Sequence, residues 1–397
     1  MSKKYNFDEI VNRRGTSCLK YDFGMKRKGR DDLLPLWVAD MDFALPQEIL
    51  DDFRARIDHG IFGYTDPDAE YFAAMDRWFF NHHGYHVDPE TVTVGCGIVY
   101  GLATGVHAFT KEGDAILIQQ PVYYPFREVI EDNGRIFINS QLHYENNYYT
   151  IDFEDFERKI VENNVKVFIL CNPHNPVGRV WKKEELERLG DICLAHNVII
   201  MDDEIHCDFV YGDNHFTSFL TLDPKYRSNL VVYTSPSKTF NVAGFQPANI
   251  IICDGELRAK YRHANAGAGY SQGNIMGITA VKSCYTKGDQ WVKELVEYIS
   301  GNIAYVRDFV KENFPKATFV EPEGTYLVWI DFSGYGYTDE ELEHIMLEEA
   351  KLWLDSGKIF GPETAQFERF NLACPRSTVE QAFNQLKDAL DRHQKWN

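Results

Sequence analysis

The sequence has no run of apolar residues long enough to cross a lipid bilayer. Its longest apolar stretches, such as Val167–Cys171 and Val198–Met201, have only four or five residues, whereas a transmembrane helix needs ~20. The first eight residues also lack the apolar segment of a signal peptide. We therefore expect a soluble, cytoplasmic protein with no membrane partner.

Positive charge is scarce. The 41 lysine and arginine residues are outnumbered by 60 aspartate and glutamate residues, which gives a formal charge of −19. Nucleic acids and anionic membranes are bound by basic surfaces. The charge balance therefore argues against both as partners.

Paired cysteines are absent as well. The eight cysteines are scattered singly, without a Cys-x-x-Cys spacing, so neither a disulfide framework nor a redox motif is expected. What the chain does have is 44% apolar and 14% aromatic residues over 397 positions. That is enough to bury several cores, and the length suggests two or three domains.

From about residue 90, short apolar runs alternate with helix-like stretches. The runs are continuous, as in strands that are covered on both faces, and alternation of strands with helices predicts a mostly parallel sheet sandwiched by helices. The expected strands are Thr91–Val94, Ala115–Gln119, Val165–Leu170, Val198–Met201, Val231–Tyr233 and Ile250–Cys253. The expected helices between them are Gly101–Thr110, Tyr124–Asn133, Asp152–Asn163 and Lys183–His196.

The pattern changes after about Lys282 and predicts a smaller α+β unit. Its expected elements are helices over Gln290–Asn313, Thr338–Ser356 and Ser377–Gln394 and strands over Ala317–Val320, Tyr326–Asp331 and Arg369–Ala373. We therefore expect an α/β fold with a large domain at 46–284 and a small domain built from both chain ends, 1–45 and 285–397.

Four turns of unusual composition follow the expected strands, where open α/β sheets bind ligands. The first, Gly95–Gly101, is a glycine-rich turn into a helix, and backbone N–H groups there suit a phosphate. It departs from the dinucleotide fingerprint because position 100 is Tyr instead of Gly. A phosphate site and a plain tight turn both explain this turn taken alone.

The second turn, Asn172–Gly178, contains two Asn-Pro steps, which force a rigid, non-helical loop at the end of a strand. The third, Asp202–His206, ends a buried strand with acids, and a buried acid is costly without a cation beside it. A zinc set of Cys171, His174, His206 and Cys207 is the weaker alternative, because their spacing is not a standard ligand pattern.

The fourth turn, Ser235–Phe240, places Lys238 among small and apolar residues. Burial of a lysine lowers its pKa, which is the requirement for a Schiff-base amine. The four turns together suit one ligand, with its phosphate on the first turn, its ring on the second, a ring cation on Asp203 and an aldehyde on Lys238. This ligand is pyridoxal 5′-phosphate (PLP). No metal is expected.

These motifs resemble the fold-type I PLP enzymes of the aminotransferase class I/II family, over nearly the whole chain. The match lies in Asn172–Gly178, Asp203–His206 and Ser235–Asn241. Together with Leu36–Phe43, these motifs look most like the bacterial cystathionine β-lyase and C–S lyase subgroup.

The resemblance implies three catalytic residues. Lys238 falls at the position of the lysine that holds PLP as a Schiff base, Asp203 at that of the acid that keeps the pyridinium protonated, and Tyr123 at that of the ring-stacking aromatic. The residues expected to bind the cofactor are Gly97, Ile98, Tyr123, Asn175, Asp203, His206, Ser235, Ser237, Lys238 and Tyr64.

The substrate residues implied by the resemblance are Arg369, Asn175 and Tyr64. Arg369 matches the arginine that clamps the substrate α-carboxylate, and Tyr64 matches a tyrosine that reaches the site of a neighbouring subunit. A homodimer is therefore expected. Two departures from the aminotransferase pattern agree with the lyase subgroup: His206 stands where aminotransferases usually have Tyr, and Gln246 where many have a basic residue.

The resemblance implies α,β-elimination of cystathionine or another cysteine S-conjugate to a thiol, pyruvate and ammonia. In this reaction Lys238 is the general base. An aminotransferase would use the same Lys238, Asp203 and Arg369, and a non-catalytic regulatory protein on the same scaffold is a second alternative.

Overall fold

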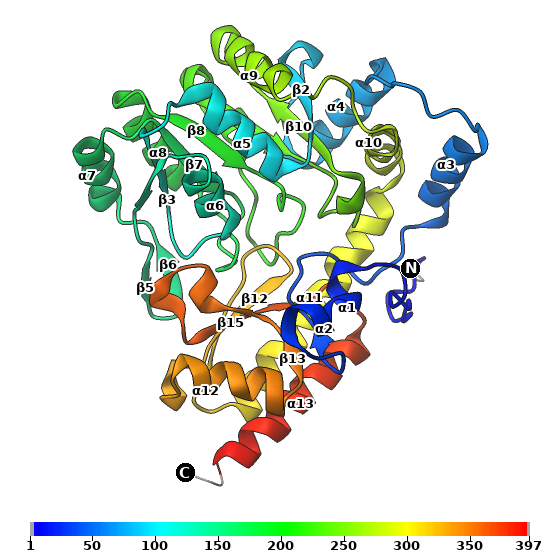
Figure 1. The fold of residues 1–397 in the computed structure, drawn as a ribbon, viewed down its shortest axis with the longest axis vertical. Helices are drawn as coiled ribbons and strands as arrows, with labels where there is room; N and C mark the ends of the chain where they lie inside the picture. The colour runs from blue at the N-terminus through cyan, green and yellow to red at the C-terminus, as the bar shows by residue number, and fades with distance from the viewer. Residues whose placement is uncertain (1–3, 395–397) are drawn as a thin grey trace.

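A seven-stranded sheet forms the centre of the computed structural model, which describes residues 4–394 (Figure 1). Its strands lie in the order β2 (Val92–Cys96), β10 (Pro247–Ile251), β9 (Leu230–Thr234), β8 (Ile199–Asp203), β7 (Val167–Cys171), β3 (Ala115–Ile118) and β4 (Ile136–Asn139). β10 is antiparallel to both neighbours, and the other four pairings are parallel. The predicted mostly parallel sheet is confirmed.

Helices cover both faces of this sheet, which explains why its central strands are apolar throughout. One buried cluster joins alternate strand residues such as Ile116 and Ile169 to α5 (Ile98–Phe109), α6 (Pro125–Glu131) and α9 (Gly255–Gly267). The intervening residues, such as Leu117 and Phe168, belong to a second cluster. That cluster includes residues of α4 (Ala69–His83), α7 (Phe153–Asn163), α8 (Lys183–Ala195) and α10 (Ile275–Lys287). The sandwich of helices around the sheet is therefore also confirmed.

A second, antiparallel sheet lies in the C-terminal part of the chain, beyond the long helix α11 (Asp289–Asn313) (Figure 1). Its strands are β11 (Thr318–Val320), β12 (Leu327–Asp331), β15 (Phe367–Asn371) and β14 (Asp355–Ser356), in that order. The last helix is α13 (Arg376–Gln394). This is the expected α+β unit. The domain boundaries at residues 46 and 284 remain a prediction, and residues 1–3 and 395–397 of the expected small domain lie outside the described residues.

The helix expected over Thr338–Ser356 is wrong in its second half. Helix α12 covers Asp339–His344 and continues as a π-helical turn to Glu349. The chain then reverses at Lys351, which has a φ of 56°, and forms β13 (Leu352–Trp353) and β14. Leu352 and Trp353 are buried and pair with β1 (Leu34–Pro35). Strand pairing to a distant segment thus replaces the local helical preference.

The segment Leu36–Phe43, here called the strap, passes between the two sheets. Leu36 N donates to Trp353 O and Asp42 N donates to Ala373 O, each at 2.9 Å. The side chain of Asn241 accepts from Met41 N at 2.9 Å and donates to Met41 O at 2.8 Å. The strap is therefore bonded to both parts of the chain.

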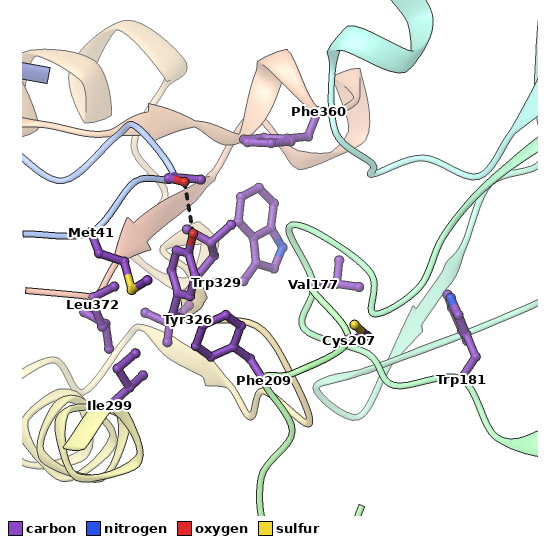
Figure 2. Packing of buried hydrophobic residues seen from close by; sticks show 14 of the residues in the cluster. Met41, Val177, Trp181, Cys207, Phe209, Ile299, Tyr326, Trp329, Phe360 and Leu372 are labelled. Carbon is purple, nitrogen blue, oxygen red and sulfur yellow. Dashed lines mark hydrogen bonds between the residues drawn. The ribbon is translucent and has the colours of Figure 1, made fainter. Parts of the chain in front are cut away.

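Apolar side chains pack below the strap. Tyr326 lies against Phe209, Ile299 and Leu372, and its hydroxyl donates to Ala39 O of the strap at 3.0 Å (Figure 2). The rings of Phe209 and Tyr326 meet edge to face with their centroids 4.8 Å apart. This packing and the hydrogen bond from Tyr326 together fix the distance between the strap and the core beneath it.

The remaining N-terminal helices are short or peripheral. They are α1 (Leu19–Asp22), α2 (Gly24–Lys28) and α3 (Gln47–Asp58), and a hairpin of β5 (His143–Glu145) and β6 (Tyr148–Thr150) lies outside both sheets. Across residues 4–394, no helix combines the length and the apolar character that a bilayer crossing requires.

Candidate active site

A cavity of about 370 Å³ opens where β7 and β8 end and α5 begins. Eight of the expected site residues line it: Gly97, Ile98, Tyr123, Asn175, Asp203, His206, Ser237 and Lys238. They come from the four turns described above and, for Tyr123, from the segment after β3. Neighbouring parallel strands end at the same edge of a sheet, which is why the four turns meet.

Lys238 reaches the cavity from the turn after β9. Its Nζ donates to Ala39 O of the strap at 2.6 Å. Burial and the charge of Arg369 lower the pKa of Lys238, Asp40 and Asp203 act in the opposite direction, and the resulting pKa is about 8. A lysine with this pKa is partly an uncharged amine near neutral pH, so it can act as a nucleophile or as a base.

Asp203 is the last residue of β8 and is buried. Ile205 N donates to its Oδ1 at 3.2 Å, and no side-chain hydrogen bond to its carboxyl is formed within residues 4–394. Burial raises the pKa of Asp203 to about 7, although the Ile205 N–H and Lys238 favour the charged form. A buried carboxyl with so little support is suited to a cationic partner, and the pyridinium nitrogen of PLP is such a group.

The N-terminus of α5 forms the third wall. Gly97 is the residue before the helix, has a φ of 81°, and no other atom lies within 4 Å of the position that a Cβ would take. The free N–H groups of the first helical turn suit an anion such as a phosphate. Together with Lys238 and Asp203, they make the site fit PLP.

Arg369 lies next to this cavity, on β15. Its Nη1 donates to Asn175 Oδ1 at 3.0 Å, and its Nη2 donates to Trp37 O at 2.7 Å and to Asp355 Oδ2. Arg369 as a whole is 2% exposed. Asn175 therefore links Arg369, from the small sheet, to the cavity at the edge of the large sheet.

The Asn-Pro loop that carries Asn175 is held from both sides. His174 Nε2 is 2.8 Å from Pro121 O, and its N–H and C=O bond to Arg179 and Gly178. Burial lowers the pKa of His174 to about 4, so its ring is neutral. The rigid loop predicted from the two Asn-Pro steps is found here.

His206 also lines the cavity and is 3% exposed. Its Nδ1 is buried without a hydrogen-bond partner among the described residues. Burial lowers its pKa well below the usual range, so the ring is neutral. An uncharged ring with a free nitrogen can accept or donate one hydrogen bond to a bound ligand.

Two expected residues lie away from the cavity wall. Ser235 is buried below it, where its Oγ donates to Pro247 O at 2.6 Å and accepts from Ser237 N at 3.0 Å. Tyr64 is 96% exposed and lies near the exposed Ile61 and Phe62 in the chain. The roles expected for Ser235 and Tyr64 in cofactor binding stay predictions.

The cavity also has lining residues that were not expected to act: Ala39, Cys96, Val99, Tyr100, Cys171, Ile205, Ala243 and Gln246. Most of them lie in the motifs that identify the site. Gln246, at the position where a basic residue was missing, accepts from Cys96 Sγ at 3.0 Å, and Gly97 N donates to Gln246 O at 2.8 Å. The contact of Asp355 with Arg369 could not be predicted from the sequence, because residues 338–356 were expected to form a helix and not a strand that pairs with β15.

Residues 31–386 match the family described as aminotransferase class I and II. The chain belongs to this family. It is 42% identical over 386 residues to cystathionine beta-lyase PatB of Bacillus subtilis (strain 168), an alignment that covers 97% of this chain and 100% of PatB.

Solved structures of similar proteins agree with the family assignment. Cystalysin from Treponema denticola, described as containing a pyridoxal 5′-phosphate cofactor, has 34% identity and a TM-score of 0.95 over 98% of this chain and 99% of its own. The PLP-bound C–S lyase from Staphylococcus hominis has 32% identity and a TM-score of 0.90 over 97% and 98%. The fold of the family therefore extends over nearly all of this chain.

Proposed function

We propose that this chain is a PLP-dependent carbon–sulfur β-lyase that converts a cysteine S-conjugate such as cystathionine to a thiol, pyruvate and ammonia. The observation that carries the proposal is the convergence of Lys238, Asp203 and Arg369 around one cavity. The 42% identity to cystathionine beta-lyase PatB over nearly the whole chain supports elimination as the reaction.

PLP would be held by three features of this chain. Lys238 attaches it covalently, Asp203 pairs with its ring nitrogen, and the N-terminus of α5 at Gly97 binds its phosphate. When bound, PLP supplies an electron sink that stabilises negative charge at the substrate Cα. Asn175, Tyr123 and His206 complete the wall around the ring.

The substrate carboxylate would bind to Arg369. A guanidinium presents parallel N–H groups that match a carboxylate, and here it is buried, so water competes little for it. Asn175, which already accepts from Arg369 Nη1, lies between this carboxylate and the cavity. The substrate is thereby fixed at one end, with its Cα near Lys238.

Once the substrate amine has taken its place on the cofactor, the freed Lys238 would remove the Cα proton. Its lowered pKa of about 8 makes the free amine available near neutral pH, and a positioned base is worth about 10²–10⁴-fold in rate. The Cβ–S bond then breaks, sulfur leaves with the electron pair and takes up a proton, and one water converts the remaining 2-aminoacrylate to pyruvate and ammonia. The same lysine can return a proton to the leaving thiolate.

The active unit would be a homodimer in which Tyr64 reaches the site of the partner subunit. Tyr64, Ile61 and Phe62 are 96%, 67% and 59% exposed. Exposed apolar side chains close together in the chain indicate a surface that is covered in an assembly. Tyr64 does not line the cavity of its own chain, and its exposure leaves it available to a neighbouring site.

The test of the proposed function is Lys238→Ala, assayed by pyruvate release from cystathionine. We expect turnover to fall by at least about 10³-fold, because both the covalent attachment of PLP and the base are lost. The matched control is Lys260→Ala, which removes an exposed lysine of α9 that pairs with Glu256. Pyruvate release that survives Lys238→Ala would contradict the proposal.

A second assay separates elimination from amino transfer. Wild-type protein is incubated with cystathionine alone, and separately with an amino acid and a 2-oxo acid. Pyruvate from the first incubation supports the lyase, and amino exchange in the second without pyruvate in the first would identify an aminotransferase. A purified protein that binds no PLP would indicate a non-catalytic role.

A further inference from the structure

Three of the five N–H donors of the Arg369 guanidinium are already occupied by protein acceptors. An arginine side chain has five N–H groups, two on each Nη and one on Nε. Both N–H groups of Nη2 are used by Trp37 O and Asp355 Oδ2, and one N–H group of Nη1 is used by Asn175 Oδ1. Nε is buried without an acceptor among the described residues.

A carboxylate that binds an arginine at two points needs two adjacent N–H groups. Each edge of the guanidinium that offers such a pair includes Nη2, either with Nη1 or with Nε. A substrate carboxylate must therefore displace one of the two acceptors on Nη2, Trp37 O or Asp355.

The two acceptors differ in how easily they move. Trp37 O belongs to the backbone of the strap, which is bonded to Trp353 and Ala373 on either side of it. Asp355 holds Arg369 through a rotatable side chain, from the position directly opposite it on β14. A second cavity, of about 320 Å³, lies beside Asp355 and is also lined by Lys28. The Asp355 side chain can therefore rotate away from Arg369 into this cavity, whereas the Trp37 carbonyl is held by the backbone of the strap.

We propose that Asp355 occupies the place of the substrate carboxylate on Arg369 and competes with it, which makes Asp355 a determinant of substrate affinity. The proposal rests on the role of Arg369 under the proposed function. In the resting protein, Asp355 neutralises a buried cation that would otherwise be unpaired, and this keeps Arg369 in place. The substrate carboxylate then binds only by displacing the Asp355 carboxylate. The free energy needed to break the pair of Arg369 with Asp355 therefore reduces the net free energy of substrate binding.

The alternative role for Asp355 is orientation of Arg369. The two roles predict opposite effects for the same substitution. Removing a competitor strengthens carboxylate binding, whereas removing an orienting group weakens it. The direction of the change in affinity therefore decides between them.

The experiment measures binding of glycine and of methylamine to the PLP-loaded protein by calorimetry. Glycine has the amine and the carboxylate of a substrate but no leaving group, and methylamine lacks only the carboxylate. For Asp355→Asn we expect glycine to bind about three- to tenfold more tightly and methylamine to change by less than about twofold. Asp355→Ser, which has no amide to contact the ligand, should show the same direction and serves if the Asn variant does not fold.

The matched control is Glu343→Gln. Glu343 lines the same 320 Å³ cavity and pairs with Lys28 and Lys358 but does not touch Arg369. Its loss should leave glycine affinity within about twofold of wild type. Weaker or unchanged glycine binding in both Asp355 variants, equal tightening of methylamine, or equal tightening in Glu343→Gln would overturn the proposal. A failure of the lyase function would appear separately, as absence of pyruvate with intact glycine binding.

Discussion

Three consecutive acids, Asp202, Asp203 and Glu204, are buried at the end of β8 but face different surroundings. Asp203 lines the cavity. The carboxyl groups of Asp202 and Glu204 are buried next to each other and outside the cavity lining. Burial raises the pKa of both, to about 7 for Glu204. Burial therefore favours the protonated form of acids that lie outside the cavity.

The titration of Glu204 should be visible in the stability of the protein. Its pKa in the folded state, about 7, lies above its ordinary value of 4.5, so its favourable contribution is complete below pH 4.5 and is lost as the pH rises through 7. Relative to wild type, Glu204→Gln should therefore gain up to about 3 kcal/mol in unfolding free energy between pH 5 and pH 8. Urea unfolding at both pH values measures this difference.

The control for this measurement is Glu184→Gln, which changes an exposed acid of α8. Its difference from wild type should be the same at both pH values within about 0.5 kcal/mol. A pH-independent difference for Glu204→Gln would show that Glu204 is ionised in the folded protein at pH 5.

At the scale of secondary structure, the sequence predicts the long and uniformly apolar elements well. All six expected strands of the large sheet overlap observed ones, because strands buried on both faces have a strong local signature. The edge strand β4 was missed, since it has only four residues and Ile136 is 52% exposed. The helix expected over 338–356 failed because the pairing of β13 with β1 depends on a segment more than 300 residues away.

The same limit applies to the site. The turns after β7, β8 and β9 could be brought together from the sequence, because parallel strands end at one edge. Contacts between segments far apart in the chain, such as Arg369 with Trp37 of the strap and with Asn175 of the Asn-Pro loop, depend on packing that no local pattern encodes. Only the resemblance to a known family placed Arg369 at the site.

The turn into α5 offers a test of its expected role in phosphate binding. Gly97 has a φ of 81° and a ψ of 155°, a conformation that is essentially restricted to glycine, with free space around its Cβ position, so Gly97→Ala introduces backbone strain of about 1–3 kcal/mol without a clash. The strained turn should shift the first N–H groups of α5, and we expect the dissociation constant for PLP to rise about tenfold. Equilibrium dialysis against PLP measures this change.

Gly84→Ala provides the matched control. Gly84 ends α4 with a φ of 76°, also has free space at its Cβ position, and is not among the residues that line the cavity. Its substitution also strains a residue with positive φ, here in the left-handed α region, but should leave PLP affinity unchanged. Equal loss of PLP affinity in both variants would mean that general destabilisation, and not the α5 turn, is responsible.

For the whole molecule, the charge of −19 contrasts with the chemistry of the site. PLP and an amino acid carboxylate are both anions, so they must be attracted locally, by Lys238, Arg369 and the N-terminus of α5. In the proposed dimer, the exposed surface that contains Tyr64 would add a contribution from the partner subunit. The complete site is thus expected only in an assembly of two chains.

Mixing two inactive variants tests this expectation. Lys238→Ala and Tyr64→Ala homodimers should each be impaired at both sites. In a mixed dimer, the Tyr64→Ala subunit keeps Lys238 and receives Tyr64 from its partner, which restores one site of two. After co-unfolding and refolding of equal amounts, pyruvate release should reach about a quarter of the wild-type rate. Activity no higher than the average of the separate variants would contradict a shared site.

The strap contacts the site through its backbone. Its carbonyl at Ala39 accepts from Lys238 Nζ, and its carbonyl at Trp37 accepts from Arg369 Nη2. Every amino acid has a carbonyl, so point mutations in the strap leave both acceptors in place. A side-chain substitution in the strap therefore does not by itself delete the groups that hold the lysine and the arginine. Leu36, Met41 and Asp42 are buried, so a substitution at one of them would reach both acceptors only by moving the backbone of the strap.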